Sequence, residues 1–130
     1  MIIGVIQAQL LIREKDLPGA IAVYQRALRL NPWIWHLHLG LAQVYRQTGQ
    51  DAQALDQFDA VLEFRLVNAQ QRKVIFVAEG EIKLKQGDLP GALVEFQKAL
   101  ELTPADAPLD EKIKRLQVQI EYQGQTEKKP

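Results

Sequence analysis

Large apolar side chains recur along the chain at intervals of three, four and seven residues, the spacing that places side chains on one face of an α-helix. Three groups show this spacing: Leu17, Tyr24 and Leu28; Leu55, Phe58 and Leu62; Leu93, Phe96 and Leu100. A further stripe consists of Leu109, Ile113, Leu116 and Ile120, with Glu111, Lys112, Lys114 and Arg115 outside it. The pattern predicts an all-α chain of amphipathic helices, each with one buried face.

Capping residues and prolines mark where several of these helices begin and end. Asp16 and Asp88 can each cap a helix, because an aspartate side chain accepts hydrogen bonds from the first amides of a helix. A proline follows each aspartate two residues later, in the first helical turn, where its missing amide costs nothing. Pro32 and Pro104 end the same helices, since the residue before a proline is pushed out of the helical region. The sequence thus predicts one helix between Asp16 and Pro32 and another between Asp88 and Pro104.

An internal repeat links these two helices. The segment DLPGA at residues 16–20 recurs letter for letter at residues 88–92, and a more divergent copy lies between them. Small residues are paired twelve apart in all three copies: Ala8 with Ala20, Ala42 with Ala54, and Gly80 with Ala92. Because only small side chains let two helices approach closely, each pair predicts a helix crossing within a hairpin.

The third copy arrives four residues later than a constant spacing would place it. The small residues Ala8 and Ala42 are 34 positions apart, whereas Ala42 and Gly80 are 38 apart. Asn68 followed by Gln71 has the spacing of a capping box. We therefore expect one additional helical turn at the start of the first helix of the third copy.

These repeats resemble the tetratricopeptide repeat, a helix–turn–helix unit of about 34 residues with small residues, aromatics and a closing proline at fixed places. The resemblance covers residues 1 to about 104, with departures at Leu11, Lys83 and Leu66. It implies a right-handed α-solenoid of antiparallel helix hairpins with seven helices. The expected single domain spans 1–123, with units at about 1–34, 35–68 and 69–106, a capping helix at about 107–123, and a disordered tail at 124–130.

Composition and charge narrow the possible functions. The chain has 16 basic and 16 acidic side chains and no basic run, so the electrostatic footprint of a nucleic-acid binder is missing. It has no cysteine, which excludes disulfides and cysteine-ligated zinc. Polar residues interrupt the apolar amino terminus before the roughly 20 residues of a membrane span, and it lacks a basic signal-peptide start. We expect a cytoplasmic protein, with a glutamine- and leucine-rich composition that suits a bacterial one.

The start of the chain carries a separate expectation. The helical pattern begins at residue 2 without a preceding capping side chain, which favours a domain cut from a longer protein.

Candidate catalytic and metal-binding groups are sparse. His36 and His38 are two residues apart, so a helix points them to different faces and predicts no shared metal ion. No phosphate-binding or dinucleotide-binding glycine pattern occurs. We expect no enzyme activity, no cofactor and no metal.

Paired carboxylates and two tryptophans are expected to have structural roles. Carboxylate pairs such as Asp56 with Asp59, and Glu79 with Glu81, are expected on solvated helix surfaces or in contacts between repeats. Trp33 and Trp35 are expected to pack between units, with a partner-binding anchor as the alternative.

The resemblance also implies a binding surface, because the first helix of each unit in this family lines a concave groove. By the family register the groove residues are Ile2, Val5, Ile6, Gln9, His36, Leu39, Gln43, Arg46, Val74, Val77, Glu81 and Leu84. This set is mainly aliphatic. Family members that clamp a peptide's terminal carboxylate use basic and asparagine side chains where this chain has Val5, Gly40, Val74 and Ala78. The expected partner is therefore an apolar or amphipathic protein segment, not a chaperone tail.

These expectations point to a non-catalytic interaction scaffold or assembly adaptor that binds a mainly apolar peptide or helix in its groove. The alternative is a self-associating domain, with a homodimer as one form, that positions or regulates another domain of a larger protein, a catalytic domain included.

Overall fold

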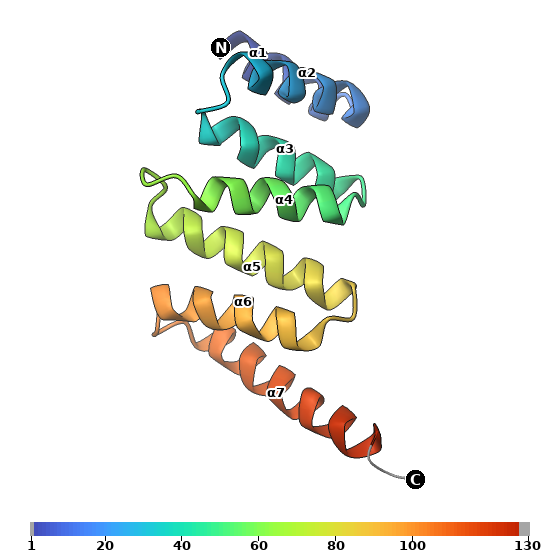
Figure 1. Cartoon of the computed structure of the whole chain (residues 1–130), viewed down its shortest axis with the longest axis vertical. Helices are drawn as coiled ribbons and strands as arrows, with labels where there is room; N and C mark the ends of the chain where they lie inside the picture. The colour runs from blue at the N-terminus through green and yellow to red at the C-terminus, as the bar shows by residue number, and fades with distance from the viewer. Residues whose placement is uncertain (1, 128–130) are drawn as a thin grey trace. The chain divides into compact units, whose positions relative to one another are not determined.

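The computed structural model describes residues 2–127, with side chains described for residues 4–126. This part of the chain contains seven helices and no strand (Figure 1), which confirms the predicted all-α fold. The helices are α1 (Ile2–Arg13), α2 (Leu17–Leu30), α3 (Trp35–Gln47), α4 (Asp51–Leu62), α5 (Ala69–Lys85), α6 (Leu89–Leu102) and α7 (Ala107–Glu127).

The two copies of DLPGA form the same helix start. The side chains of Asp16 and Asp88 accept hydrogen bonds of 3.0 Å from the amides of Gly19 and Gly91. Each bond satisfies one of the amides that a helix N-terminus leaves without a partner. The predicted caps of α2 and α6 are thereby confirmed, and these helices end at Leu30 and Leu102, before the expected prolines.

The additional turn lies at the start of α5, as predicted. Asn68 and Gln71 form a complete capping box, in which the Asn68 side chain accepts a 2.9 Å bond from the Gln71 amide. α5 has 17 residues, whereas α3 has 13. The four added residues precede Gly80, which is the twelfth residue of α5, while the corresponding Ala42 is the eighth of α3.

The chain divides into two compact units at the boundary between Val67 and Asn68. In the N-terminal unit, α1 packs on α2, α2 on α3, and α3 on α4. Its core contains the four small residues of the first two hairpins, Ala8, Ala20, Ala42 and Ala54, all fully buried. The small side chains therefore lie in the interior, as the crossing argument expects. A single domain over 1–123 stays a prediction.

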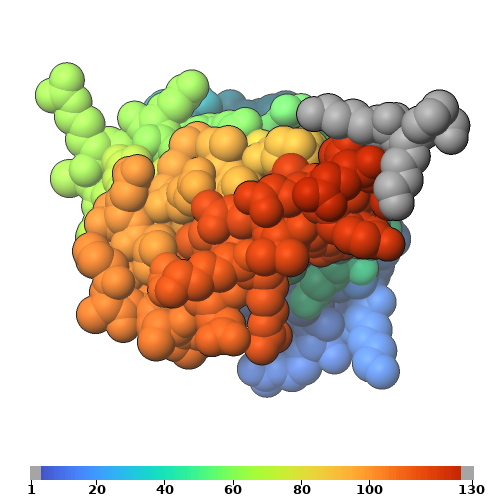
Figure 2. Space-filling view, turned by 90° about the horizontal axis from the view of Figure 1, so that it is seen from below, coloured from blue at the N-terminus to red at the C-terminus, as the bar shows by residue number. Residues whose placement is uncertain are grey.

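In the C-terminal unit, α5 packs on α6 and α6 on α7. Leu109, Ile113 and Leu116 of α7 join Phe96 and its neighbours in one apolar cluster, and Figure 2 shows α7 lying across α6. α7 thus buries the apolar stripe that was read from the sequence. A helix in this place covers hairpin surface that water would otherwise contact.

α7 is longer than the sequence suggested. It continues to Glu127, so residues 124–127, expected in a disordered tail, are helical, while 128–130 lie outside the described residues. The Thr126 hydroxyl donates to the carbonyl oxygens of Tyr122 and Gln123 at 3.2 and 2.9 Å. No proline interrupts this segment, and one internal glycine costs a helix only about 1 kcal/mol. The polar composition alone was therefore a poor guide to the end of the helix.

Candidate partner-binding surface

In the N-terminal unit, the predicted groove residues of α1 and α3 differ in how far they reach solvent. Ile6, Gln9, His36 and Gln43 are exposed. Val5, Leu39 and Arg46 are half-buried. The side chain of Ile2 lies outside the described residues. On these two helices, most of the exposed groove residues are therefore polar, and Ile6 is the exposed aliphatic one.

A hollow on α3 is lined by polar residues. Gln43, Arg46 and Gln47 line an open space of about 460 Å³. Gln43 and Arg46 were predicted groove residues. Gln47 was missed, although it follows Gln43 by four residues and so shares its helix face. Two amide groups, each with donors and an acceptor, can pair with the backbone of an extended segment or with polar side chains.

In the C-terminal unit, the predicted groove residues of α5 are divided between surface and core. Val74 is 50% exposed. Val77 and Leu84 are partly buried and pack against the cluster that contains Phe96. Glu81 faces Lys112 of α7, with 3.8 Å between Oε1 and Nζ. Val74 is therefore the α5 residue whose apolar side chain is most available to a partner.

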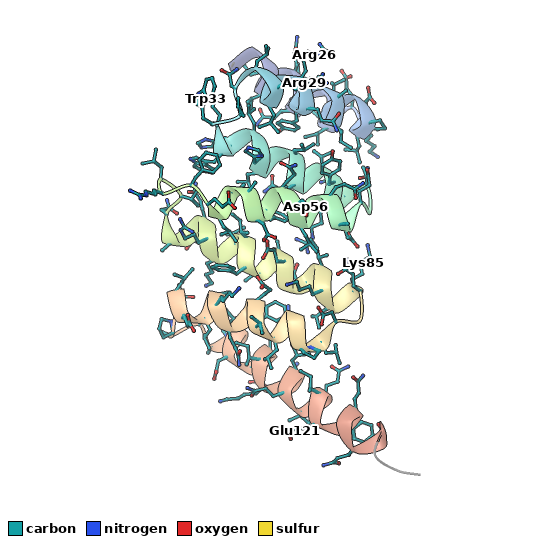
Figure 3. All side chains as sticks on the ribbon, in the orientation of Figure 1. Arg26, Arg29, Trp33, Asp56, Lys85 and Glu121 are labelled. Carbon is teal, nitrogen blue, oxygen red and sulfur yellow. The ribbon has the colours of Figure 1, made fainter. Side chains whose placement is uncertain are left out.

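The tryptophans behave differently from one another. Trp33 is 66% exposed in the connection between α2 and α3 (Figure 3), so its expected role in packing between units is wrong. Trp35 stacks on the ring of His36, with 3.6 Å between the ring centroids. An exposed tryptophan is a common anchor at protein interfaces.

The two histidines have separate surroundings. His38 contacts Gln57 Oε1 through Nδ1 at 2.8 Å and the Pro32 carbonyl oxygen through Nε2 at 3.1 Å. His36 is held by its stacking on Trp35. Among the residues that the structure describes, no group of three metal-ligating side chains comes together.

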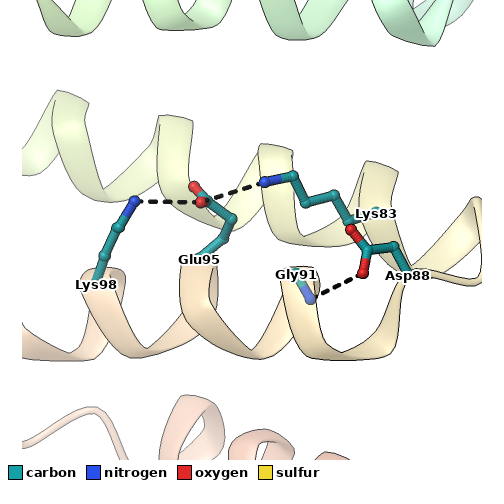
Figure 4. Close-up of polar contacts among 5 residues, drawn as sticks. All are labelled: Lys83, Asp88, Gly91, Glu95 and Lys98. Carbon is teal, nitrogen blue, oxygen red and sulfur yellow. Dashed lines mark hydrogen bonds and ion pairs between the residues drawn. The ribbon is translucent and has the colours of Figure 1, made fainter.

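The expectation of a solvated Glu79 is also wrong, because Glu79 and Glu95 are only 3% and 4% exposed. Glu95 Oε1 lies 3.4 Å from Nζ of both Lys83 and Lys98 (Figure 4). Burial alone would raise the pKa of Glu95, but a hydrogen bond with Glu79 and the two ammonium groups outweigh burial and lower it. Figure 4 places this cluster between α5 and α6, where it supports the hairpin that carries Val74.

A second polar contact fixes the start of α7. Asp106 accepts hydrogen bonds from Lys73 Nζ at 2.6 Å and from the Leu109 amide at 3.1 Å. Both bonds, that from Lys73 first, lower the pKa of Asp106. The contact joins the first turns of α5 to the start of α7.

Sequence comparison with known proteins supports the repeat that was predicted from the sequence. A model of the tetratricopeptide repeat family matches residues 11–74. BBSome complex member BBS4 of Mus musculus is 30% identical over 91 residues, which are 70% of this chain but only 16% of that protein. The matched chain thus spans about a sixth of this curated relative.

Solved structures share the fold. The N-terminal domain of stress-induced protein-1 from C. elegans superposes with a TM-score of 0.77 and 22% identity, over 85% of this chain and 88% of that one. The first repeat domain of Spaghetti (RPAP3), bound to the HSP90 peptide SRMEEVD, gives 0.73 and 13% identity, over 92% and 91%. The family model and the shared fold support a tetratricopeptide repeat family. In the described part of the chain, no helix is long and apolar enough to cross a membrane.

Proposed function

We propose that the chain is a non-catalytic protein–protein interaction scaffold or assembly adaptor that binds a mainly apolar peptide or amphipathic helix. The binding residues are those of the predicted groove, on α1 and α3 in the N-terminal unit and on α5 in the C-terminal unit. The observation that carries the proposal is the exposure of Ile6 and Val74, 49% and 50%, on these first helices. Exposed aliphatic side chains lose their water when a partner covers them, which favours binding.

The polar groups would orient the partner. Gln9 and Gln43 are exposed on the same helices as Ile6 and Leu39, and Gln47 adds a second amide to the α3 hollow. Amide side chains can donate to and accept from a peptide backbone without a net charge. Apolar anchors at helical spacing, together with such amides, are how a groove recognises an amphipathic helix.

A solved structure of the same fold with a bound peptide supports the proposal that this chain binds a peptide. The Spaghetti domain holds the peptide SRMEEVD, which contains three acidic residues. In this chain, the places expected to clamp a terminal carboxylate hold Val5, Gly40, Val74 and Ala78, none of them charged. We therefore propose an apolar partner for this chain and not an acidic tail.

The test begins with a random peptide library selected on the immobilised protein, followed by affinity measurements on the selected peptides. We expect the peptides to be rich in apolar residues at helical spacing. Val74→Asp on α5 should weaken their binding by about tenfold or more, because it puts a charge into the contact.

The matched control is Val94→Asp on α6, where the valine is 48% exposed but lies outside the predicted groove. Its effect should stay within about twofold, as for most surface substitutions. Peptides rich in charge, or equal losses in the two variants, would refute the proposal. Val77 is less suitable for this test, because it contacts the core and its substitution would damage folding.

A second candidate function is self-association. It is favoured by a different surface, the open face of the α1–α2 hairpin.

A further inference from the structure

The α1–α2 hairpin carries a groove between its two helices. One hollow of about 160 Å³ is lined by Gly4, Gln7, Val23, Arg26, Ala27, Leu30 and Asn31. A second, of about 360 Å³, is lined by Gln7, Leu10, Leu11, Glu14 and Val23. Because the two hollows share Gln7 and Val23, they adjoin, and together we call them the hairpin groove.

The hairpin groove is apolar and open. Leu10 is 48% exposed and Leu30 71% exposed, although both are large aliphatic side chains. The lining residues come from α1, from α2 and from the adjoining Glu14 and Asn31, and none comes from α3 or α4. α3 packs on α2 much as α7 packs on α6 in the C-terminal unit, so one face of the α1–α2 hairpin is covered. The hairpin groove is a different surface, and within the N-terminal unit α3 and α4 leave it open.

Opposite charges mark the two ends of the hairpin groove. Glu14 lines one hollow and Arg26 lines the other. Among the described residues, neither side chain forms an ion pair. Arg26 projects from the hairpin toward solvent in Figure 3. Gln7, which both hollows share, lies between the two charges.

This arrangement matches itself under a two-fold rotation. An axis through the middle of the hairpin groove carries the acidic end of one copy onto the basic end of another. Glu14, the residue after the end of α1, follows Gln7 by seven residues, about two helical turns, and Arg26 follows Val23 by three residues along α2. The longer arginine side chain makes up part of the difference. Gln7 would sit near the axis, where its amide can donate to and accept from its own counterpart.

We propose that the hairpin groove binds the same groove of a second copy of this chain and forms a two-fold symmetric dimer. Leu10 and Leu30 lose their exposure in the contact, and Glu14 of each copy pairs with Arg26 of the other. A symmetric interface makes each favourable pair twice, which is why two ion pairs form from one set of residues. The inference does not depend on the proposed peptide-binding function.

The test is a charge exchange followed by mass measurement in solution from micromolar to millimolar concentration. Wild type should be dimeric in the upper part of this range. Glu14→Arg and Arg26→Glu should each weaken dimerisation by about tenfold or more, since each places two like-charged pairs across the axis. The double variant, with both charges exchanged, should return to within about threefold of wild type, because every pair is again opposite in sign.

Each alternative result overturns the proposal. If the wild-type chain stays monomeric at millimolar concentration, the hairpin groove does not bind a second copy. A dimer unaffected by the single reversals uses a different surface, and a double variant as weak as the single ones excludes the two-fold pairing. Leu30→Asp, at a site 71% exposed, gives a second test and should also produce monomers. Val74→Asp should leave the dimer unchanged, so failure of the two proposals can be told apart.

Discussion

The ring of Phe96 in α6 lies directly over the backbone of Gly80 in α5. A Cβ atom on residue 80 would come 2.7 Å from Cε1 of this ring, closer than atoms in contact can approach. Phe96 is fully buried in the cluster that α7 completes, so the ring has little room to move. The absence of a side chain at Gly80 is therefore what lets α5 and α6 pack closely.

Gly80→Ala should destabilise the protein for this reason. Overpacking a filled core costs about 1–3 kcal/mol, and the better helix propensity of alanine returns up to about 1 kcal/mol. We expect a net loss of roughly 1–2 kcal/mol in the free energy of unfolding, measured by denaturant titration. Gly124→Ala in α7 is the matched control, because nothing lies within 4 Å of a Cβ atom there. Similar effects of the two substitutions would show that the Phe96 contact does not limit the packing.

The buried carboxylate of Glu95 should also contribute to stability. Glu95→Gln removes the charge that faces Lys83 and Lys98, and we expect a loss of about 1–3 kcal/mol, typical of hydrogen bonds to charged groups. The control is Glu111→Gln, where the side chain is 66% exposed and pairs with Arg115 one turn away. That change should cost less than about 0.5 kcal/mol. If both variants unfold at the same denaturant concentration, the buried cluster is not stabilising.

Stability should fall in acid partly through Asp106. Its pKa is lowered below the ordinary value of 3.8 in the folded chain, so the folded state favours the ionised form. The stabilising effect is therefore present above pH 3.8 and is lost as the pH falls through the folded-state pKa. Asp106→Asn keeps a capping side chain but removes the charge.

The measurement is the unfolding free energy of both proteins across this pH range. Wild type should be the more stable near neutral pH, and the difference should vanish in acid. A difference that stays constant with pH would contradict the role of the Asp106 charge.

Local sequence signals predicted the helix starts and the crossings well. The caps at Asp16 and Asp88 depend only on residues three positions away, so the sequence contains all the necessary information. The small residue at position 80 was identified because its partner, Ala92, follows at the same spacing as in the other repeats. The added turn of α5 could be placed because Asn68 and Gln71 form a local motif.

Side-chain environments that depend on other helices were harder to predict. Glu79 has the charge of a surface residue, yet the packing of α5 encloses it beside Glu95. Val77 is apolar whether it lines a groove or contacts a core, and only the position of α6 and α7 distinguishes the two. Trp33 is exposed because of the shape of the α2–α3 connection, which no periodic pattern records. For such residues the sequence defines the chemistry but not the neighbours.

The central claim, that a partner binds to the first helices of the repeats, is tested most directly by methyl NMR spectroscopy of the whole chain. The probe is the tightest peptide from the library selection, titrated into protein labelled at isoleucine, leucine and valine methyl groups. The account predicts the largest shift changes at Ile6, Leu39 and Val74, with little change at Val94, Val118 and Leu30. Shift changes concentrated at Val94, Val118 or Leu30, with Ile6, Leu39 and Val74 unaffected, would contradict it.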